Sequence, residues 1–209
     1  ADKDEVYGLQ MLSSDGLLAA SAGCQVQLWD LNRATCVTQT TFATADNGYI
    51  FGGEARNPER KAYVFNLAAR GRALCTAVSD GTVRLLDSQT LQTISVLTEH
   101  VQRGAPVFGV AIATASPLLA TADSQGAVML WDLRQTGRGP VAEATRNGAV
   151  HSVAFVRGVD GSAEMLVSGA NDRTICLHEM RAASLKTESS VSVLSAVLCV
   201  GAAPDSARL

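Results

Sequence analysis

Few side chains in this sequence have the types and spacing that enzyme chemistry needs. The histidines His100, His151 and His178 lie far apart, and no nucleophile motif or phosphate-binding glycine loop occurs in the chain. Asp80 and Asp172 follow strand-like runs, where a turn explains an aspartate better than acid–base catalysis does. The sequence therefore predicts no catalytic residue, although a fold that converges side chains on a central channel would remain an alternative.

The cysteines predict packed thiols rather than disulfides or a metal site. There are five, an odd number, and all except Cys24 lie in strand-like apolar runs. This usage is typical of a reducing, intracellular location, for which we expect the cytoplasm, with the nucleus and the cytoskeleton as alternatives. Cys176 and His178 are the only close Cys/His pair, and they would supply two ligands at most. We expect neither a metal nor a cofactor.

The composition permits a large core and disfavours two classes of partner. The chain has 209 residues, 47% of them hydrophobic, and a formal net charge of -3. This balance offers no excess of positive charge to nucleic acid. The longest apolar run, from Val193 to Ala203, is about half the length that a membrane-spanning helix needs. We therefore expect neither nucleic-acid binding nor membrane insertion.

One local pattern occurs four times and must determine the architecture. An apolar pair, small residues, a tight turn and alternating apolar residues end in Trp-Asp or in a degenerate form of it. The four copies are Leu17–Asp30, Leu74–Asp87, Leu118–Asp132 and Leu166–Glu179. One apolar run precedes each copy and another follows it, which predicts four short antiparallel strands per unit. Such a unit cannot bury its apolar face alone, so the units must stack.

These units resemble the repeats of the WD-repeat β-propeller family. Trp29-Asp30 and Trp131-Asp132 match the closing dipeptide, and the spacing from Asp87 to Asp132 and on to Glu179 is close to the family period of ~40–45 residues. The resemblance implies an all-β propeller of four-stranded antiparallel blades in a single domain over residues 1–209. About six blades are traceable, and seven are expected in the intact protein.

Two segments fit the repeat poorly, and we interpret them as degenerate blades at 41–72 and 187–209. In the first, Lys61–Asn66 resembles the third strand of a worn repeat; in the second, Leu198–Leu209 resembles Leu74–Leu85. We expect the domain to be incomplete at its C-terminus, since ring closure removes the unpaired edges that an open sheet exposes. The alternative is a small, divergent propeller.

The resemblance also implies a hydrogen-bonded chain across each blade, built from a histidine before the blade, a serine or threonine, a turn aspartate and the tryptophan. By position, the structural motif residues are Trp29, Asp30, Thr76, Asp80, Asp87, Thr121, Trp131, Asp132, Ser168 and Asp172. We expect no blade to carry the full set. Arg103 and Arg146 occupy the histidine positions, Gln125 replaces one turn aspartate, and His178 replaces one tryptophan.

One motif bears on the partner. Trp131-Asp132-Leu133-Arg134 resembles the Trp-Asp-x-Arg signature of propellers that serve as substrate receptors of cullin-type ubiquitin ligases. In those proteins the arginine reaches an adaptor, so Arg134 is the partner-binding candidate; the alternative is a solvated turn residue. We expect a non-catalytic scaffold that binds proteins of a larger complex, with a ligase receptor as the alternative function.

Overall fold

The computed structural model describes residues 5–12, 16–43, 62–157, 164–181 and 184–201, and these residues form an all-β fold. Apart from strands, they contain one helical turn, α1 (Glu99–Gln102), and one 3-10 turn, η1 (Thr136–Arg138). This outcome confirms the prediction of strands with almost no helix. No helix in these ranges is long and apolar enough to cross a membrane.

The strands form four antiparallel sheets, each of four strands in chain order. Sheet 1 contains β1 (Val6–Met11), β2 (Leu17–Ala22), β3 (Gln25–Asp30) and β4 (Thr35–Thr41). Sheet 2 contains β5 (Val64–Arg70), β6 (Ala73–Val78), β7 (Val83–Asp87) and β8 (Thr93–Leu97). Sheet 3 contains β9 (Val107–Ile112), β10 (Leu118–Asp123), β11 (Ala127–Asp132) and β12 (Ala142–Thr145). Sheet 4 contains β13 (Val150–Arg157), β14 (Glu164–Ala170), β15 (Thr174–Arg181) and β16 (Ser184–Ser192).

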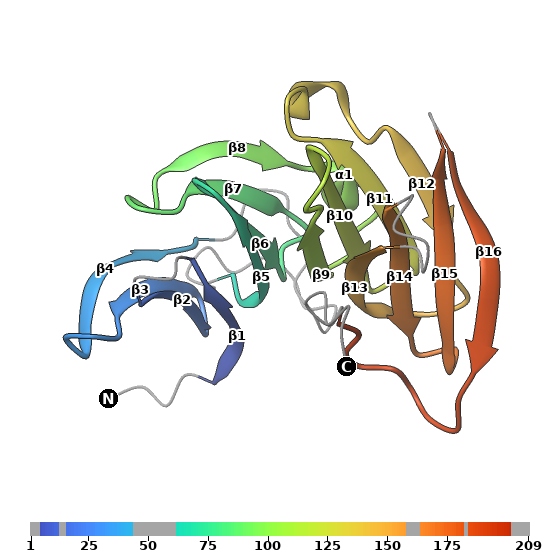
Figure 1. Ribbon diagram of the computed structural model, residues 1–209, viewed down its shortest axis with the longest axis horizontal. Coiled ribbons are helices and arrows are strands. Elements are labelled where there is room, and N and C mark those ends of the chain that lie inside the picture. Colours follow the sequence, from blue (N-terminus) through green and yellow to red (C-terminus); the bar gives the residue numbers. More distant parts are fainter. Residues whose placement is uncertain (1–4, 13–15, 44–61, 158–163, 182–183, 202–209) are drawn as a thin grey trace.

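Consecutive sheets stack through their first strands, which gives a propeller-like arrangement. β1 contacts β5, β5 contacts β9, and β9 contacts β13. Figure 1 shows the sheets fanning outward from these strands, with β4, β8 and β16 on the outside. We call the side on which β1, β5, β9 and β13 begin the strand-start face, and the side on which they end the strand-end face. Because neighbouring strands are antiparallel, the turn between the second and third strands of each sheet also lies on the strand-start face.

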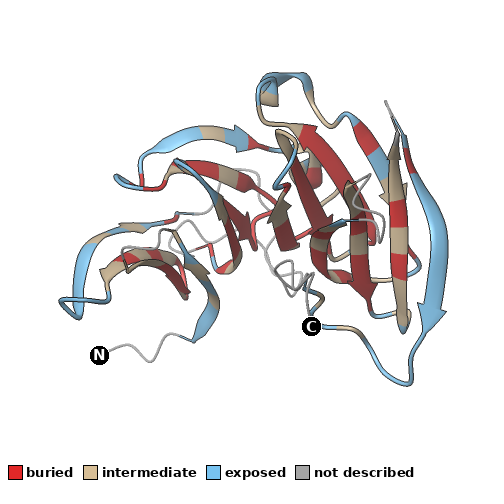
Figure 2. Cartoon of the chain, in the orientation of Figure 1, coloured by how far each residue is buried: buried red, intermediate tan, exposed pale blue. Residues whose placement is uncertain are grey.

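The apolar core lies between adjacent sheets. One cluster joins sheets 1 and 2, a second joins sheets 2 and 3, and a third joins sheets 3 and 4. Successive strand residues point to opposite sides, so a central sheet supplies both of its neighbours. Trp131 is 0% exposed in the cluster between sheets 2 and 3, so its side chain is buried between these two sheets. Figure 2 shows burial concentrated in the middle sheets and exposure on the outermost strands.

The three regularly spaced repeats each form a complete sheet of four strands. The prediction that Lys61–Asn66 belongs to the third strand of a separate blade is wrong. Val64–Arg70 is β5, the first strand of sheet 2, rather than the third strand of a separate blade. Its apolar spacing, Val64-x-x-Leu67, matches that of Val107-x-x-Val110 at the start of sheet 3. Most of the remaining candidate segment, residues 44–61, lies outside the described residues.

Part of the second segment, residues 187–209, belongs to sheet 4. Residues 187–192 complete β16, and residues 193–201, which contain no strand, run past β13 and β14. There the Val197 N–H donates to the Ala170 carbonyl, and the Val200 N–H donates to Ser152 Oγ. Residues 202–209 lie outside the described part of the chain. The described residues hold four sheets, and the number of blades in the intact protein stays a prediction.

A glycine at one strand-start turn permits a close backbone approach. Gly126 has a φ of +95°, and its carbonyl accepts a hydrogen bond of 2.8 Å from the Arg146 N–H. A Cβ atom there would collide with the Arg146 carbonyl oxygen. Gly71, at a strand-end turn, also has positive φ, +58°, but a Cβ atom there would meet nothing within 4 Å.

We therefore expect Gly126→Ala to destabilise the fold more than Gly71→Ala. Gly71→Ala should cost about 1–2 kcal/mol, because only the left-handed backbone is strained. Gly126→Ala adds a collision with backbone and should cost about 2–4 kcal/mol. Urea unfolding of both variants measures the difference. Equal losses would show that the approach to Arg146 relaxes without cost.

Candidate functional site

A buried hydrogen-bonded chain crosses sheet 3. His100 Nδ1 lies 2.9 Å from Asp123 Oδ2, and His100 Nε2 lies 2.7 Å from Thr121 Oγ1. The indole N–H of Trp131 donates to the same Thr121 oxygen at 2.9 Å. All four side chains are buried, so each bond is shielded from water. The chain connects α1, the second strand, which supplies both Thr121 and Asp123, and the third strand.

One proton arrangement satisfies every member of this chain. Thr121 accepts from Trp131 and can donate its own proton to His100 Nε2, which leaves the Nδ1–H of His100 to donate to Asp123. Burial raises the pKa of Asp123, but hydrogen bonds from His100 and from two backbone N–H groups outweigh burial and lower the pKa overall. The carboxylate therefore holds the histidine in place as a structural group.

This complete set contradicts the expectation that no sheet would carry one. His100 and Arg103 are three residues apart on a helical turn, so both reach the same place, and Arg103 Nε lies 3.5 Å from Asp123 Oδ2. Asp123, the last residue of β10, takes the role expected at Gln125, and it accepts a hydrogen bond from the backbone N–H of Gln125 in the turn that follows. Residue positions alone do not predict this hydrogen-bonded chain, because His100 lies three residues before the expected histidine position and Asp123 lies two residues before the expected aspartate position.

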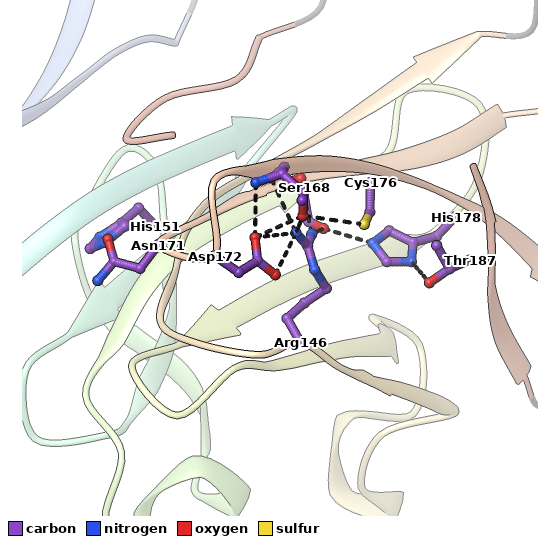
Figure 3. A network of polar contacts seen from close by, with 9 residues as sticks. Arg146, His151, Ser168, Asn171, Asp172, Cys176, His178 and Thr187 are labelled. Atoms are coloured by element: carbon purple, nitrogen blue, oxygen red, sulfur yellow. Dashed lines mark hydrogen bonds and ion pairs between the residues drawn. The ribbon is translucent and has the colours of Figure 1, made fainter. Parts of the chain in front are cut away.

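Sheet 4 uses different chemistry in the equivalent place (Figure 3). Arg146, in the connection before β13, donates to Ser168 Oγ and to Asp172 Oδ1, the latter at 2.9 Å. Ser168 Oγ lies 2.7 Å from His178 Nε2, and His178 Nδ1 lies 3.2 Å from Thr187 Oγ1. Arg146 thus stands where sheet 3 has His100, and His178 stands where sheet 3 has Trp131.

His178 is held neutral in this arrangement. Burial, with the charge of Arg146 as a second cause, lowers its pKa to about 4. Ser168 accepts from Arg146, so its own proton can go to His178 Nε2, and the Nδ1–H of His178 is left for Thr187. A protonated His178 would lose its bond from Ser168 and would face the Arg146 cation.

The remaining motif residues of sheets 1 and 2 make smaller sets of contacts. Thr76 Oγ1 donates to the Arg84 carbonyl rather than to another side chain of the motif. Asp80 accepts from the Thr82 hydroxyl at 2.6 Å and pairs with Arg84 at 3.2 Å. Trp29 is half-buried, and its indole N–H donates to Gln27. The hydrogen bonds between described residues do not join Thr76, Asp80 and Trp29 into a chain like that of sheet 3.

The aspartates that end the third strands have a shared task on the strand-end face. Asp30, Asp87 and Asp132 each accept a hydrogen bond from the backbone N–H two residues later. Such bonds fix the turn that leads to the fourth strand. These backbone bonds are the leading cause that lowers the pKa of Asp87. The aspartate that ends the third strand thus fixes the following turn in sheets 1, 2 and 3.

Arg134 lies on the strand-end face with its side chain 70% exposed. Its Nε donates to Asp132 Oδ1 at 2.9 Å, and its Nη2 donates to Asp132 Oδ2 at 2.6 Å. Arg134 lowers the pKa of the Asp132 carboxyl to about 2, so the pair is ionised at neutral pH. Arg72 makes the same kind of pair with Asp87, at the same exposure.

Reactive groups are scarce among the described residues. They contain no cluster of three or more His, Cys, Asp or Glu side chains able to hold a metal ion. Burial raises the pKa of the Cys75 thiol to about 12, which keeps it protonated and unreactive at neutral pH. The arrangement of polar groups stabilises sheets and turns.

The neutral state of His178 predicts a pH dependence of stability. Its pKa is about 4 in the folded chain, against 6.5 ordinarily, so the unfolded chain binds the proton more readily between these values. The neutral state of His178 therefore contributes up to about 3 kcal/mol to the free energy of unfolding. This contribution is fully present above pH 6.5 and is lost as the pH falls toward 4.

Wild type should therefore lose stability relative to His178→Asn as the pH falls through this window, as measured by urea unfolding at each pH. Ile94→Ala, which changes an exposed side chain that does not titrate, is the control and should keep the wild-type pH profile. Parallel curves for wild type and His178→Asn would contradict the neutral assignment.

Comparison with known proteins supports the fold and one repeat. The family model for the WD domain, G-beta repeat, matches residues 91–132. The crystal structure of the computationally designed Ika8 protein is similar, with a TM-score of 0.65 and 15% identity, covering 93% of this chain and 51% of that one. The chain therefore spans about half the length of that protein, and the likeness concerns the fold alone. No curated protein matches.

The matched residues run from just before β8 to the end of β11, so they include the fourth strand of sheet 2 and the first three strands of sheet 3. They also contain the complete chain of His100, Asp123, Thr121 and Trp131. The protein contains a WD repeat over residues 91–132, which confirms the resemblance to the WD-repeat family.

Proposed function

We propose that this protein is a non-catalytic scaffold that presents its faces to other proteins in a multi-subunit assembly. The observation that carries the proposal is the use of its best-placed polar groups. His100 and Asp123 in sheet 3, and Arg146 and His178 in sheet 4, are buried and bonded within their own sheets. Groups engaged in this way stabilise the frame and are not available to a substrate.

The exposed polar groups lie on turns held by that frame, which is the usual place for binding residues. The WD repeat at residues 91–132 belongs to a class of module that typically serves protein–protein interaction, and the net charge of -3 favours protein over nucleic-acid partners. The free cysteines Cys24, Cys36, Cys75, Cys176 and Cys199 support a cytoplasmic location.

A ubiquitin-ligase substrate receptor is the second candidate function. It is favoured by the exposed guanidinium of Arg134, which Asp132 holds on the strand-end face. Docking on an adaptor would require Arg134 to use its remaining N–H groups or to give up part of its bond to Asp132. Arg72 forms a similar pair with Asp87, so a role in stabilising the turn explains the pairing of Arg134 with Asp132 equally well.

We expect Arg134→Ala to leave the partners recovered by quantitative pull-down unchanged. An exposed substitution should also change the free energy of unfolding by no more than about 0.5 kcal/mol. Arg72→Ala is the matched control, because it removes an arginine of equal exposure from an aspartate pair on the same face. Selective loss of a cullin adaptor in Arg134→Ala, with that adaptor retained in Arg72→Ala, would favour the receptor function instead.

A further inference from the structure

Four aromatic rings, one from each sheet, form a continuous row across the strand-start face. The ring centroids of Tyr7 and Phe65 are 5.5 Å apart, those of Phe65 and Phe108 are 5.4 Å apart, and those of Phe108 and His151 are 5.2 Å apart. The first two pairs meet edge to face, and the last pair is stacked. These distances are typical of favourable aromatic contacts. We call these four residues the aromatic row.

A β-bulge in the first strand of each sheet orients each ring of the aromatic row. In sheet 1, Val6 pairs with Ala22 and Gly8 pairs with Ser21, so Tyr7 is left without a cross-strand partner. The pairing shifts at the same place in the first strands of the other sheets, at Phe65, Phe108 and His151. A β-bulge of this kind turns its extra residue away from the regular pleat. The same bulge in four sheets brings side chains from distant parts of the sequence into one line.

The aromatic row is accessible, and one end of it carries a fixed carboxylate. Tyr7 is 44% exposed, and the other three rings are half-buried. The Tyr7 hydroxyl donates to Glu5 Oε2 at 2.9 Å, and the Glu5 carbonyl accepts a bond from the Gly23 N–H. Both the side chain and the backbone of Glu5 are therefore held beside the first ring. The basic residue Arg70 lies at the end of β5 opposite to Phe65, where it donates to the carbonyls of Ala113 and Ser116.

We propose that the aromatic row binds an arginine side chain presented by a partner protein. A guanidinium is planar and cationic, so it can stack on the exposed ring surface while its N–H groups bond the Glu5 carboxylate. A lysine ammonium fits less well, because it is a compact, strongly hydrated charge without a flat surface to stack. The inference rests on the scaffold function and specifies one docking site for it.

The test uses the tripeptide acetyl-Ala-Arg-Ala-amide and its citrulline counterpart, which keeps the planar shape without the charge. Binding is followed by NMR through the aromatic signals of Tyr7, Phe65 and Phe108. The arginine peptide should shift these signals in a saturable way, and the citrulline peptide should bind at least about fivefold more weakly. Equal binding of the two peptides, or no binding of the arginine peptide at its solubility limit, would overturn the proposal.

Variants separate the aromatic row from its surroundings. Phe65→Leu removes one ring, and Glu5→Gln removes the charge; each should weaken binding of the arginine peptide at least about threefold. Ile94→Ala changes an exposed apolar residue of β8 and should leave binding unchanged. Amide spectra of each variant report whether it is folded. Wild-type affinity in a folded Glu5→Gln or Phe65→Leu variant would count against the site.

The two proposals can fail separately. If wild type recovers protein partners in a pull-down but does not bind the arginine peptide, the docking site is wrong and the scaffold function stands. If wild type binds the arginine peptide but recovers no protein partner, the scaffold function is overturned, together with the assignment of the arginine to a partner protein.

Discussion

Every sheet in this protein depends on the next one to bury its apolar side chains. A four-stranded sheet has two faces, and the clusters between sheets 1 and 2, 2 and 3, and 3 and 4 show how the faces are shared. Sheet 3, which has a neighbour on each side, is buried over most of its second and third strands. In sheet 1, Leu9 and Met11 remain exposed on a strand that, among the described residues, packs against a neighbouring sheet on one side only. Stacking, rather than any single contact, determines which residues form the core.

Buried polar side chains are hydrogen-bonded across sheets 3 and 4 by two different sets of residues. Sheet 3 satisfies its buried groups with a histidine, an aspartate, a threonine and a tryptophan, while sheet 4 replaces the histidine with Arg146 and the tryptophan with His178. In both arrangements the histidine and the hydroxyl side chain are hydrogen-bonded, as buried polar groups usually are, whereas Arg103 Nε beside Asp123 is buried without a hydrogen bond. The second brings a permanent cation inward, and Asp172 compensates for it.

The stacking that forms the core also creates the surface that a partner can use. Because the first strands lie side by side, a feature repeated in each becomes a row rather than an isolated spot. The bulges at Tyr7, Phe65, Phe108 and His151 make the aromatic row in this way. On the strand-end face, the exposed arginines Arg72 and Arg134 pair with aspartates that end third strands.

The sequence by itself determined the unit: four strands, their apolar alternation and the tight turns, all of which depend on contacts close along the chain. It misplaced Val64–Leu67, because an apolar strand looks alike in any position of a sheet. Only the tertiary structure decided that His100 meets Asp123, that Arg146 serves His178, and that four rings form a row. Those contacts depend on the lengths of connections, on bulges and on stacking between sheets. No residue pattern within one repeat specifies these distances, because they are fixed only when the sheets pack together.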